Sequence, residues 1–151
     1  MAIREDDLTH PAVIALLEHH VAEARASTPR EHAHALDLDA LRTPDITVFT
    51  AWDGDDLLGI AALRRLDDAH GEVKSMRTAP ERLRRGAATA LLGHIVTVAR
   101  AEGLTRLSLE TGTAPMFDPA NRLYETFGFA DGPVFGGYPE SANNRFMTLA
   151  L

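Results

Sequence analysis

A candidate binding site lies in the middle of the chain, in RLRRGAATALLGHI, residues 82–95. Arg84 and Arg85 come directly before Gly86 and a run of small residues, and a helical hydrophobic repeat follows. The small residues are Ala87, Ala88, Thr89 and Ala90. The first N–H groups of a helix have no intrahelical partner and lie at the positive end of its dipole, so the stretch predicts a site for an anion such as phosphate. A helix that packs its first turn closely on a strand also needs small residues, and this stretch alone leaves the two interpretations level.

Other chemistries are excluded by residue type. The chain has no cysteine, which removes disulfides, thiolate metal sites and a cysteine-borne acyl intermediate. The pairs His19-His20 and His32-x-His34 have no acidic partner at metal-ligand spacing, so we expect no metal site. The nucleotide fingerprints G-x-x-x-x-G-K-[ST] and G-x-G-x-x-G are both missing.

The elements that must position such a site alternate along the chain. In the first half, the pattern predicts a strand at 2–4, a helix at 11–26 opened by Thr9, and a short helix through Leu36, Leu38 and Leu41. Strands at 46–52 and 57–66 flank the turn Asp53-Gly54, which predicts a hairpin.

In the second half, the small-residue stretch leads into a helix over 88–99 whose apolar positions form one continuous stripe. Strands are expected before and after it, at 71–78 and 104–111, then a short helix ended by Gly128, then strands at 134–138 and 145–151. A strand, a crossover helix and a strand imply parallel pairing, whereas hairpins imply antiparallel pairing. The chain therefore predicts an α/β (α+β) fold, a mixed sheet covered by helices.

Length and composition fit one domain spanning residues 1–151. No apolar stretch approaches the roughly 18 residues that span a bilayer, and the polar start MAIREDDLTH resembles neither a signal nor a transit peptide, so we expect a cytoplasmic protein that does not bind membranes. The net charge of -7 argues against a nucleic-acid partner. It is compatible with a small anion held by a local basic patch.

Two motifs resemble those of the GNAT superfamily of acyl-CoA N-acyltransferases. RGAATA, residues 85–90, fits the family's Q/R-x-x-G-x-G/A with alanine for the central glycine, and PANRLYETFGF, residues 119–129, is similar to A-x-x-L-Y-x-x-x-G-F. The resemblance covers at least residues 46–151. More narrowly, HALDLD, GEVKSM, LSLETGT, FDPANRLYE and RFMTL are similar to a bacterial branch of uncharacterised GNAT proteins.

The resemblance implies a mostly antiparallel, twisted sheet of about six to seven strands, with a central parallel pair splayed apart, and about four helices. It implies acetyl-CoA as acyl donor, with its pyrophosphate on the N–H groups of residues 85–90 beside Arg84. The pantetheine arm would pair with the backbone of Met76, Arg77 and Thr78. Many members carry asparagine seven residues before the tyrosine; this chain has Phe117 there, and Asn121 is a nearby candidate replacement.

The implied reaction moves the acetyl group directly to a primary amine of a small molecule. Tyr124 is the motif-matched general acid. Glu72 and Glu110, one on each splayed strand, are candidate bases, and a water relay in place of either stays open. A backbone N–H near residues 76–78 would hold the oxyanion. His34 is the candidate acceptor contact, because the N-terminal helices wall the acceptor pocket in the family.

Two alternatives remain from the sequence. A GNAT-like fold can bind acyl-CoA as a non-catalytic sensor or interaction module, and an unrelated α/β nucleotide-binding domain would bind ATP or NAD and not CoA. The acceptor's identity, the acyl length and the choice between monomer and homodimer are open at this stage.

Overall fold

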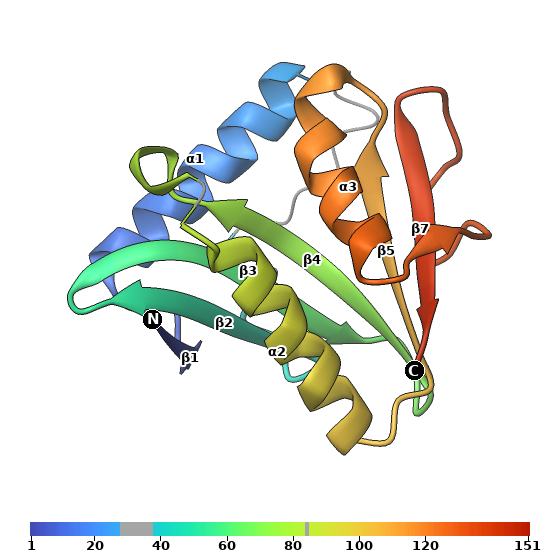
Figure 1. Cartoon of the computed structure of the whole chain (residues 1–151), viewed down its shortest axis with the longest axis horizontal. Helices are drawn as coiled ribbons and strands as arrows, with labels where there is room; N and C mark the ends of the chain where they lie inside the picture. The colour runs from blue at the N-terminus through green and yellow to red at the C-terminus, as the bar shows by residue number, and fades with distance from the viewer. Residues whose placement is uncertain (28–37, 84) are drawn as a thin grey trace.

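A strongly twisted seven-stranded sheet forms the centre of the structure (Figure 1). This computed structural model describes residues 1–27, 38–83 and 85–151. The strands are β1 (Ala2–Asp6), β2 (Ile46–Asp53), β3 (Asp56–Arg65), β4 (His70–Thr78), β5 (Arg106–Gly112), β6 (Ala130–Asp131) and β7 (Asn144–Ala150). Their order across the sheet is β1-β2-β3-β4-β5-β7-β6.

Pairing in this sheet is antiparallel except between β4 and β5. The parallel pair is the one joined by a crossover helix, as the strand–helix–strand pattern predicts. The hairpin between β2 and β3 turns at Gly54, whose φ of 58° is one that glycine adopts without strain. The expected mixed, mostly antiparallel sheet is therefore confirmed.

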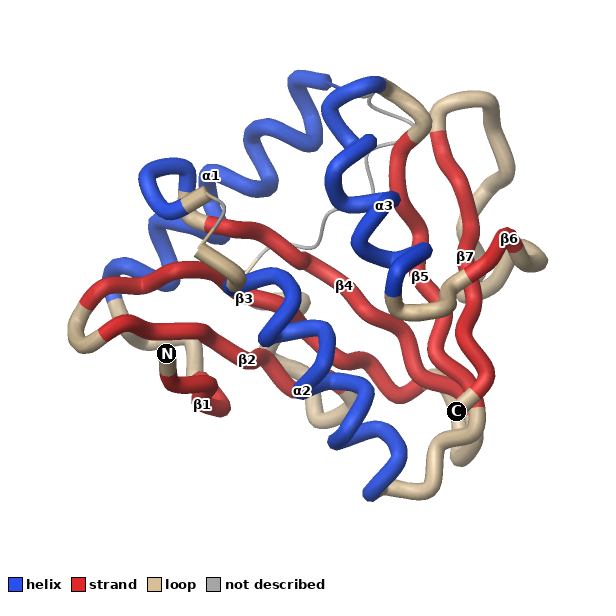
Figure 2. Tube along the Cα trace, in the orientation of Figure 1, coloured by secondary structure: helices blue, strands red, loops and turns tan. Residues whose placement is uncertain are grey.

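Helices cover both faces of the sheet, as the tube in Figure 2 shows. In the described part of the chain, three α-helices and two 3₁₀ turns occur, against an expectation of about four helices. They are α1 (Pro11–Ser27), η2 (Pro80–Arg82), α2 (Ala87–Ala101), η3 (Pro115–Phe117) and α3 (Asp118–Thr126). None of the described helices is long and apolar enough to cross a membrane.

Alternation along β3 separates the two cores. Ala61 and Leu63 pack in the cluster that contains the α2 stripe, whereas Ile60 and Ala62 pack with the apolar side of α1. Successive side chains of a strand point to opposite faces, so α1 and α2 lie on opposite sides of the sheet. We refer to these sides as the α1 face and the α2 face.

Two sequence-based elements are wrong or displaced. Residues 134–138 were expected to form a strand, but they are a loop, because Gly136 and Gly137 adopt φ values of 63° and 76° that a strand does not accommodate. The short strand beside β7 is instead β6. Of the short helix expected through Leu36, Leu38 and Leu41, residues 38–41 form a turn, and Leu36 lies outside the described residues.

Candidate active site

A gap opens between β4 and β5 in the middle of the sheet. The two strands pair at only three positions, His70 with Arg106, Gly71 with Leu107, and Glu72 with Ser108. Beyond Glu72, β4 continues to Thr78 and β5 to Gly112 without further pairing between them, and the two strands diverge in Figures 1 and 2. The edge of β4 that faces β5 is therefore open to a ligand with backbone-like polar groups.

A β-bulge in β4 lies just past the point of divergence. The register with β3 passes from Ala62–Lys74 to Ile60–Arg77, so that Ser75 and Met76 together stand opposite one β3 residue. Ser75 has a φ of 54°, a left-handed conformation that is uncommon outside glycine. Bulges redirect backbone and side-chain groups, and this one lies where the gap begins to widen.

The start of α2 presents unpaired backbone donors. Gly86 is the N-cap, with φ 80° and no side-chain capping bond, and the first intrahelical bond runs from the N–H of Ala90 to the carbonyl of Gly86. Ala87 is only 1% exposed and packs beside Gly59 of β3. Close packing thus accounts for alanine at 87, whereas Thr89 is exposed and the N–H groups at this end lack helical partners. Close packing is thus observed at Ala87, whereas an anion at the N–H groups stays a prediction.

Tyr124 reaches the gap from α3. It is buried against the α2-face core, and its hydroxyl lies 4.0 Å from the sulfur of Met76 on β4. Burial raises the pKa of Tyr124 to about 12, so the phenol keeps its proton at neutral pH. The structure therefore brings two sequence-predicted residues together across the gap, on its α2 face.

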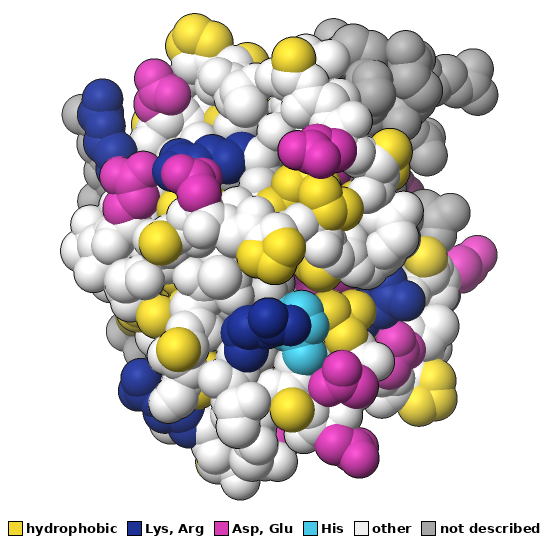
Figure 3. Space-filling view, turned by 90° about the vertical axis from the view of Figure 1, so that its right-hand side faces the viewer, with side chains coloured by type: hydrophobic (Ala, Val, Ile, Leu, Met, Phe, Trp, Pro, Cys, Tyr) yellow, Lys and Arg dark blue, Asp and Glu magenta, His cyan; other side chains and the backbone are white. Residues whose placement is uncertain are grey.

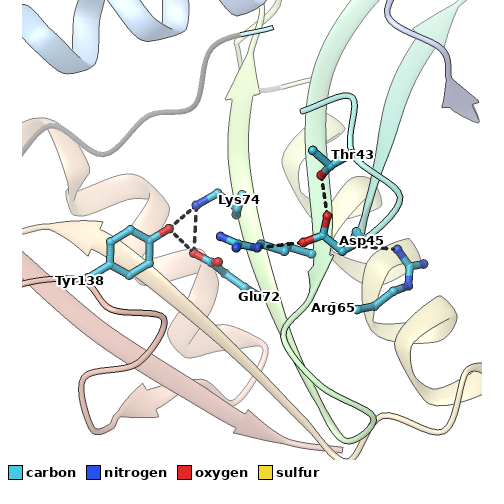
Figure 4. A network of polar contacts seen from close by, with 7 residues as sticks. Thr43, Asp45, Arg65, Glu72, Lys74 and Tyr138 are labelled. Carbon is cyan, nitrogen blue, oxygen red and sulfur yellow. Dashed lines mark hydrogen bonds and ion pairs between the residues drawn. The ribbon is translucent and has the colours of Figure 1, made fainter. Parts of the chain in front are cut away.

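On the α1 face of the gap, three side chains form a buried polar cluster (Figure 4). The Nζ atom of Lys74 lies 3.1 Å from Oε2 of Glu72, and the side chains are 6% and 2% exposed. The hydroxyl of Tyr138 donates to the same oxygen at 2.7 Å and accepts from Lys74. Burial and the Glu72 charge raise the pKa of Tyr138, which therefore stays neutral.

Glu110 faces the same side from β5. Its Oε2 accepts a hydrogen bond from the amide of Asn144 at 2.9 Å, and the residue is half-buried. The two candidate bases thus differ: Glu72 is enclosed and paired with an ammonium, whereas Glu110 is more accessible and held by an amide.

A series of side-chain hydrogen bonds links the strands at the closed end of the gap. Arg106 donates to Nδ1 of His70 at 3.2 Å, so His70 carries its proton on Nε2 and donates it to Ser108, 2.6 Å away. Ser108 then donates to Thr148 at 3.2 Å, and Thr148 to the carbonyl of Leu107. Burial and Arg106 lower the pKa of His70, which agrees with a neutral ring. Because His70 donates to Ser108, it does not accept the Ser108 proton. This hydrogen-bond series therefore links the strands and does not activate Ser108 as a nucleophile.

A separate cavity of about 310 Å³ opens beside β1 and β2, lined by Glu5, Asp6 and Asp7 among others. It lies on the far side of the sheet order from the gap, and no group of the polar cluster lines it. We therefore place the candidate site at the gap.

Comparisons with known proteins agree with this architecture. The chain matches the acetyltransferase (GNAT) family over residues 13–129. It is 50% identical to the uncharacterized N-acetyltransferase YedL of Escherichia coli strain K12, over 99% of this chain and 94% of that protein. The chain belongs to the GNAT acetyltransferase family.

Solved structures share the GNAT fold at low sequence identity. A putative acyl-CoA N-acyltransferase from Klebsiella pneumoniae matches with a TM-score of 0.78 at 20% identity, covering 99% of this chain and 97% of that one. A GNAT family acetyltransferase from Elizabethkingia anophelis with acetyl-CoA bound matches with a TM-score of 0.72 at 18% identity and the same coverage. As a member of this family, the protein is an acyl-CoA-dependent N-acyltransferase, which excludes the unrelated nucleotide-binding domain.

Other sequence-predicted residues have the following surroundings in this GNAT structure. Arg85 is half-exposed and bonds Asp53 at 2.8 Å, so an anion at α2 would compete with that carboxylate for it. The amide of Asn121 is engaged, donating to the carbonyl of Gly112 and accepting from Thr111. Arg84 and His34 lie outside the described residues.

Lys74 and Tyr138 are functional candidates that the sequence reasoning missed. Lys74 stands two residues after Glu72 on a strand, and this spacing places both side chains on one face, so the sequence held a usable signal. Tyr138 joins them from a loop 64 residues further on, and no local pattern reveals such a contact.

Proposed function

We propose that the protein transfers the acetyl group of acetyl-CoA directly to a primary amine of a small molecule, through a tetrahedral intermediate and without an acyl-enzyme. The observation that carries this proposal is the gap itself: an open strand edge on β4, with the Tyr124 hydroxyl on one face and the Glu72 cluster on the other. A donor and an acceptor entering from opposite faces would meet between the strands.

In this proposal, acetyl-CoA lies along β4 and α2. Its pyrophosphate sits on the N–H groups of residues 85–90, with Arg84 and Arg85 supplying positive charge. Its pantetheine arm pairs with the backbone of Met76, Arg77 and Thr78, as a neighbouring strand would. Asn121 stays a predicted contact, but the bonds it makes within the chain support a role in joining α3 to β5.

The chemistry requires three proton or charge movements. The amine nitrogen attacks the thioester carbon, and a backbone N–H among residues 76–78 stabilises the oxyanion, which is worth about 3 kcal/mol in comparable sites. Tyr124 is the proposed general acid for the departing thiolate. Glu72 or Glu110, or a water held by one of them, takes the amine proton.

The partners follow from the same proposal. The acceptor is a small-molecule amine reached from the α1 face, with His34 as a proposed contact. Residues 1–151 act as one domain, as monomer or homodimer, without metal, membrane or nucleic acid, in the cytoplasm. Figure 3 shows one side of the molecule, on which acidic, basic and apolar side chains are interspersed.

A thiol-release assay tests the proposal. Purified protein is incubated with acetyl-CoA and a panel of amines, and free CoA thiol is measured; the chain contributes no thiol of its own. We expect release that depends on the amine and a product heavier than the amine by one acetyl group. Binding of acetyl-CoA without amine-dependent release would instead support a non-catalytic acyl-CoA-binding module.

A further inference from the structure

One carboxylate oxygen of the polar cluster has no partner. Oε2 of Glu72 receives bonds from both Lys74 and Tyr138, whereas Oε1 is buried and accepts none from the described residues. The Glu72 side chain is 2% exposed. Leaving a buried carboxylate oxygen without a donor is unfavourable, and such atoms in native proteins call for a bound water or ligand.

The position of this oxygen points to the acceptor. Glu72 is the last β4 residue that pairs with β5, so it stands where the gap opens. Lys74 is the next residue on the same face of β4, and it lies beyond the paired part of the strand. Oε1 of Glu72 therefore lies enclosed at the apex of the gap, on its α1 face.

Lys74 changes what kind of donor this oxygen prefers. Its ammonium lies 3.1 Å from Glu72, so the pair carries no net charge, and Tyr138 is held neutral beside it. A ligand ammonium at Oε1 would lose its hydration, and repulsion by Lys74 would offset much of its attraction to the Glu72 carboxylate. An uncharged N–H donor loses far less hydration and meets no repulsion, while its lone pair remains free for attack.

Among the described residues, the other charged groups that face the cluster come from three strands. Arg64 of β3 is paired with Asp45 at 3.2 Å, and His70 of β4 has a pKa lowered by burial and Arg106. Glu110 of β5 carries the remaining negative charge; it is half-buried and bound by Asn144. Glu110 is therefore a rival site for an ammonium, which the variants below test.

Aromatic rings line the same side. Phe135 lies 5.6 Å from Tyr138 and 5.8 Å from Phe146 between ring centroids, and Phe146 is 7% exposed. Such rings favour an apolar or aromatic body on the ligand.

We propose that the acceptor docks as an uncharged amine, donating an N–H to Oε1 of Glu72, and that Lys74 is the specificity-determining residue that rejects ammonium. The acceptor class is then amines of low basicity on an apolar or aromatic body, such as aryl amines and hydrazines. This proposal rests on the proposed function. In the reaction the N–C bond forms as the amine adds to the thioester carbon, and the amine proton passes to Oε1. The C–S bond breaks when the tetrahedral intermediate collapses, and Tyr124 protonates the departing thiolate sulfur.

Binding measured against pH tests the docking without any turnover. Benzylamine is titrated into the complex of protein with CoA by calorimetry between pH 6.5 and 8.5. An alkyl amine has a pKa of roughly 10, so its neutral fraction rises about tenfold per pH unit in this range. We expect Kd to fall by the same factor, about 100-fold in all, while benzyl alcohol, an uncharged isostere, keeps a constant Kd.

Variants separate the two carboxylates. In Lys74→Met the slope should flatten, with benzylamine at pH 6.5 bound about tenfold more tightly than by wild type; Lys74→Arg should keep the slope. Arg65→Met, which removes a cation paired with Glu102 elsewhere, is the matched control and should behave as wild type. If Lys74→Met does not fold, the dependence of Kd on pH in the wild type and in Lys74→Arg tests the proposal.

A flat wild-type Kd across this pH range, or no binding at millimolar amine, overturns the proposal. A flat Kd that is weakened in Glu110→Gln assigns the dock to Glu110 instead. Thiol release is scored separately with aniline and benzylamine. A steep Kd without release by any amine would leave the docking intact and remove the transferase function.

Discussion

Tyr124 is enclosed by apolar residues, and its hydroxyl touches a methionine sulfur. Because burial raises its pKa to about 12, it holds its proton over the whole physiological range, as a proton donor must. Replacing it with Phe removes the hydroxyl and leaves the ring packed on Phe129.

For Tyr124→Phe we expect kcat to fall by about 10²-fold or more, with acetyl-CoA affinity unchanged, since general acid catalysis contributes on the order of 10²–10⁴. The thermal midpoint should move by little, because only a weak O–H···S contact is lost. Steady-state kinetics and calorimetry check both halves. An unchanged kcat would assign the protonation step to another group.

At the scale of elements, the glycine at the start of α2 has a matched control in the turn between β2 and β3. Gly86 and Gly54 have φ values of 80° and 58°, and an added methyl group would have ample room at both: its nearest neighbour at Gly86 is 4.0 Å away, and nothing lies within 4 Å at Gly54. Alanine at either site should therefore lower stability by a similar amount, about 1 kcal/mol, through backbone strain alone.

Only Gly86→Ala should also weaken CoA binding, because its methyl group stands at the donor-bearing end of the helix. Thermal unfolding and CoA titration of the two variants separate strain from binding. Equal CoA affinity in the two variants would contradict the placement of the pyrophosphate at the start of α2.

The junction of β5 and α3 depends on a close aromatic contact. A Cβ at Gly112 would lie 2.2 Å from the ring of Phe117. Gly112→Ala should therefore destabilise the protein by about 1–3 kcal/mol, through overpacking. In a denaturation cycle, Phe117→Ala should relieve most of that loss; additive effects would mean that the contact is not the cause.

Elements were predictable from sequence where local chemistry specifies them. Asp53-Gly54 predicted the hairpin, and the apolar stripe predicted α2. The buried face of α2 has the expected residues except at its start, where Ala87 is buried and Ala88, expected there, is half-buried. The prediction of a strand at 134–138 was wrong because its hydrophobic residues flank two glycines at which the backbone turns.

The site was predictable in part, for the same reason. Two motifs pointed to Tyr124 and to the helix start, because each motif is one continuous stretch of sequence. The bond between Tyr138 and Glu72 spans 66 residues, and only the folded sheet brings the two together. The pairing of Arg85 with Asp53 is equally non-local.

At the scale of the whole molecule, a half-buried histidine of α1, His20, links stability to pH. Burial, together with Arg77 and His19, lowers the pKa of His20 to about 4 from 6.5. Between these values the unfolded chain binds more protons than the native protein, so stability is present above pH 6.5 and declines as the pH falls toward 4.

The loss should reach up to about 3 kcal/mol, and His20→Gln should reduce it. Denaturant unfolding at pH 7, 5.5 and 4.5 measures it. His70, whose pKa is also lowered, adds a loss in the same direction that the variant retains. An identical pH profile in wild type and variant would contradict the assignment to His20.

Lys74 is the one lysine in the sequence, and its side chain is 6% exposed. Thioesters such as acetyl-CoA acetylate accessible lysines without any enzyme, and a protein that binds one is steadily exposed to that damage. With its lysine enclosed by Glu72 and Tyr138 and its surface cations supplied by arginine, this chain offers no side-chain amine to the reagent. Intact-mass spectra after long incubation with acetyl-CoA should show no acetyl adduct on Lys74, and a substantial adduct there would mean that the cluster opens.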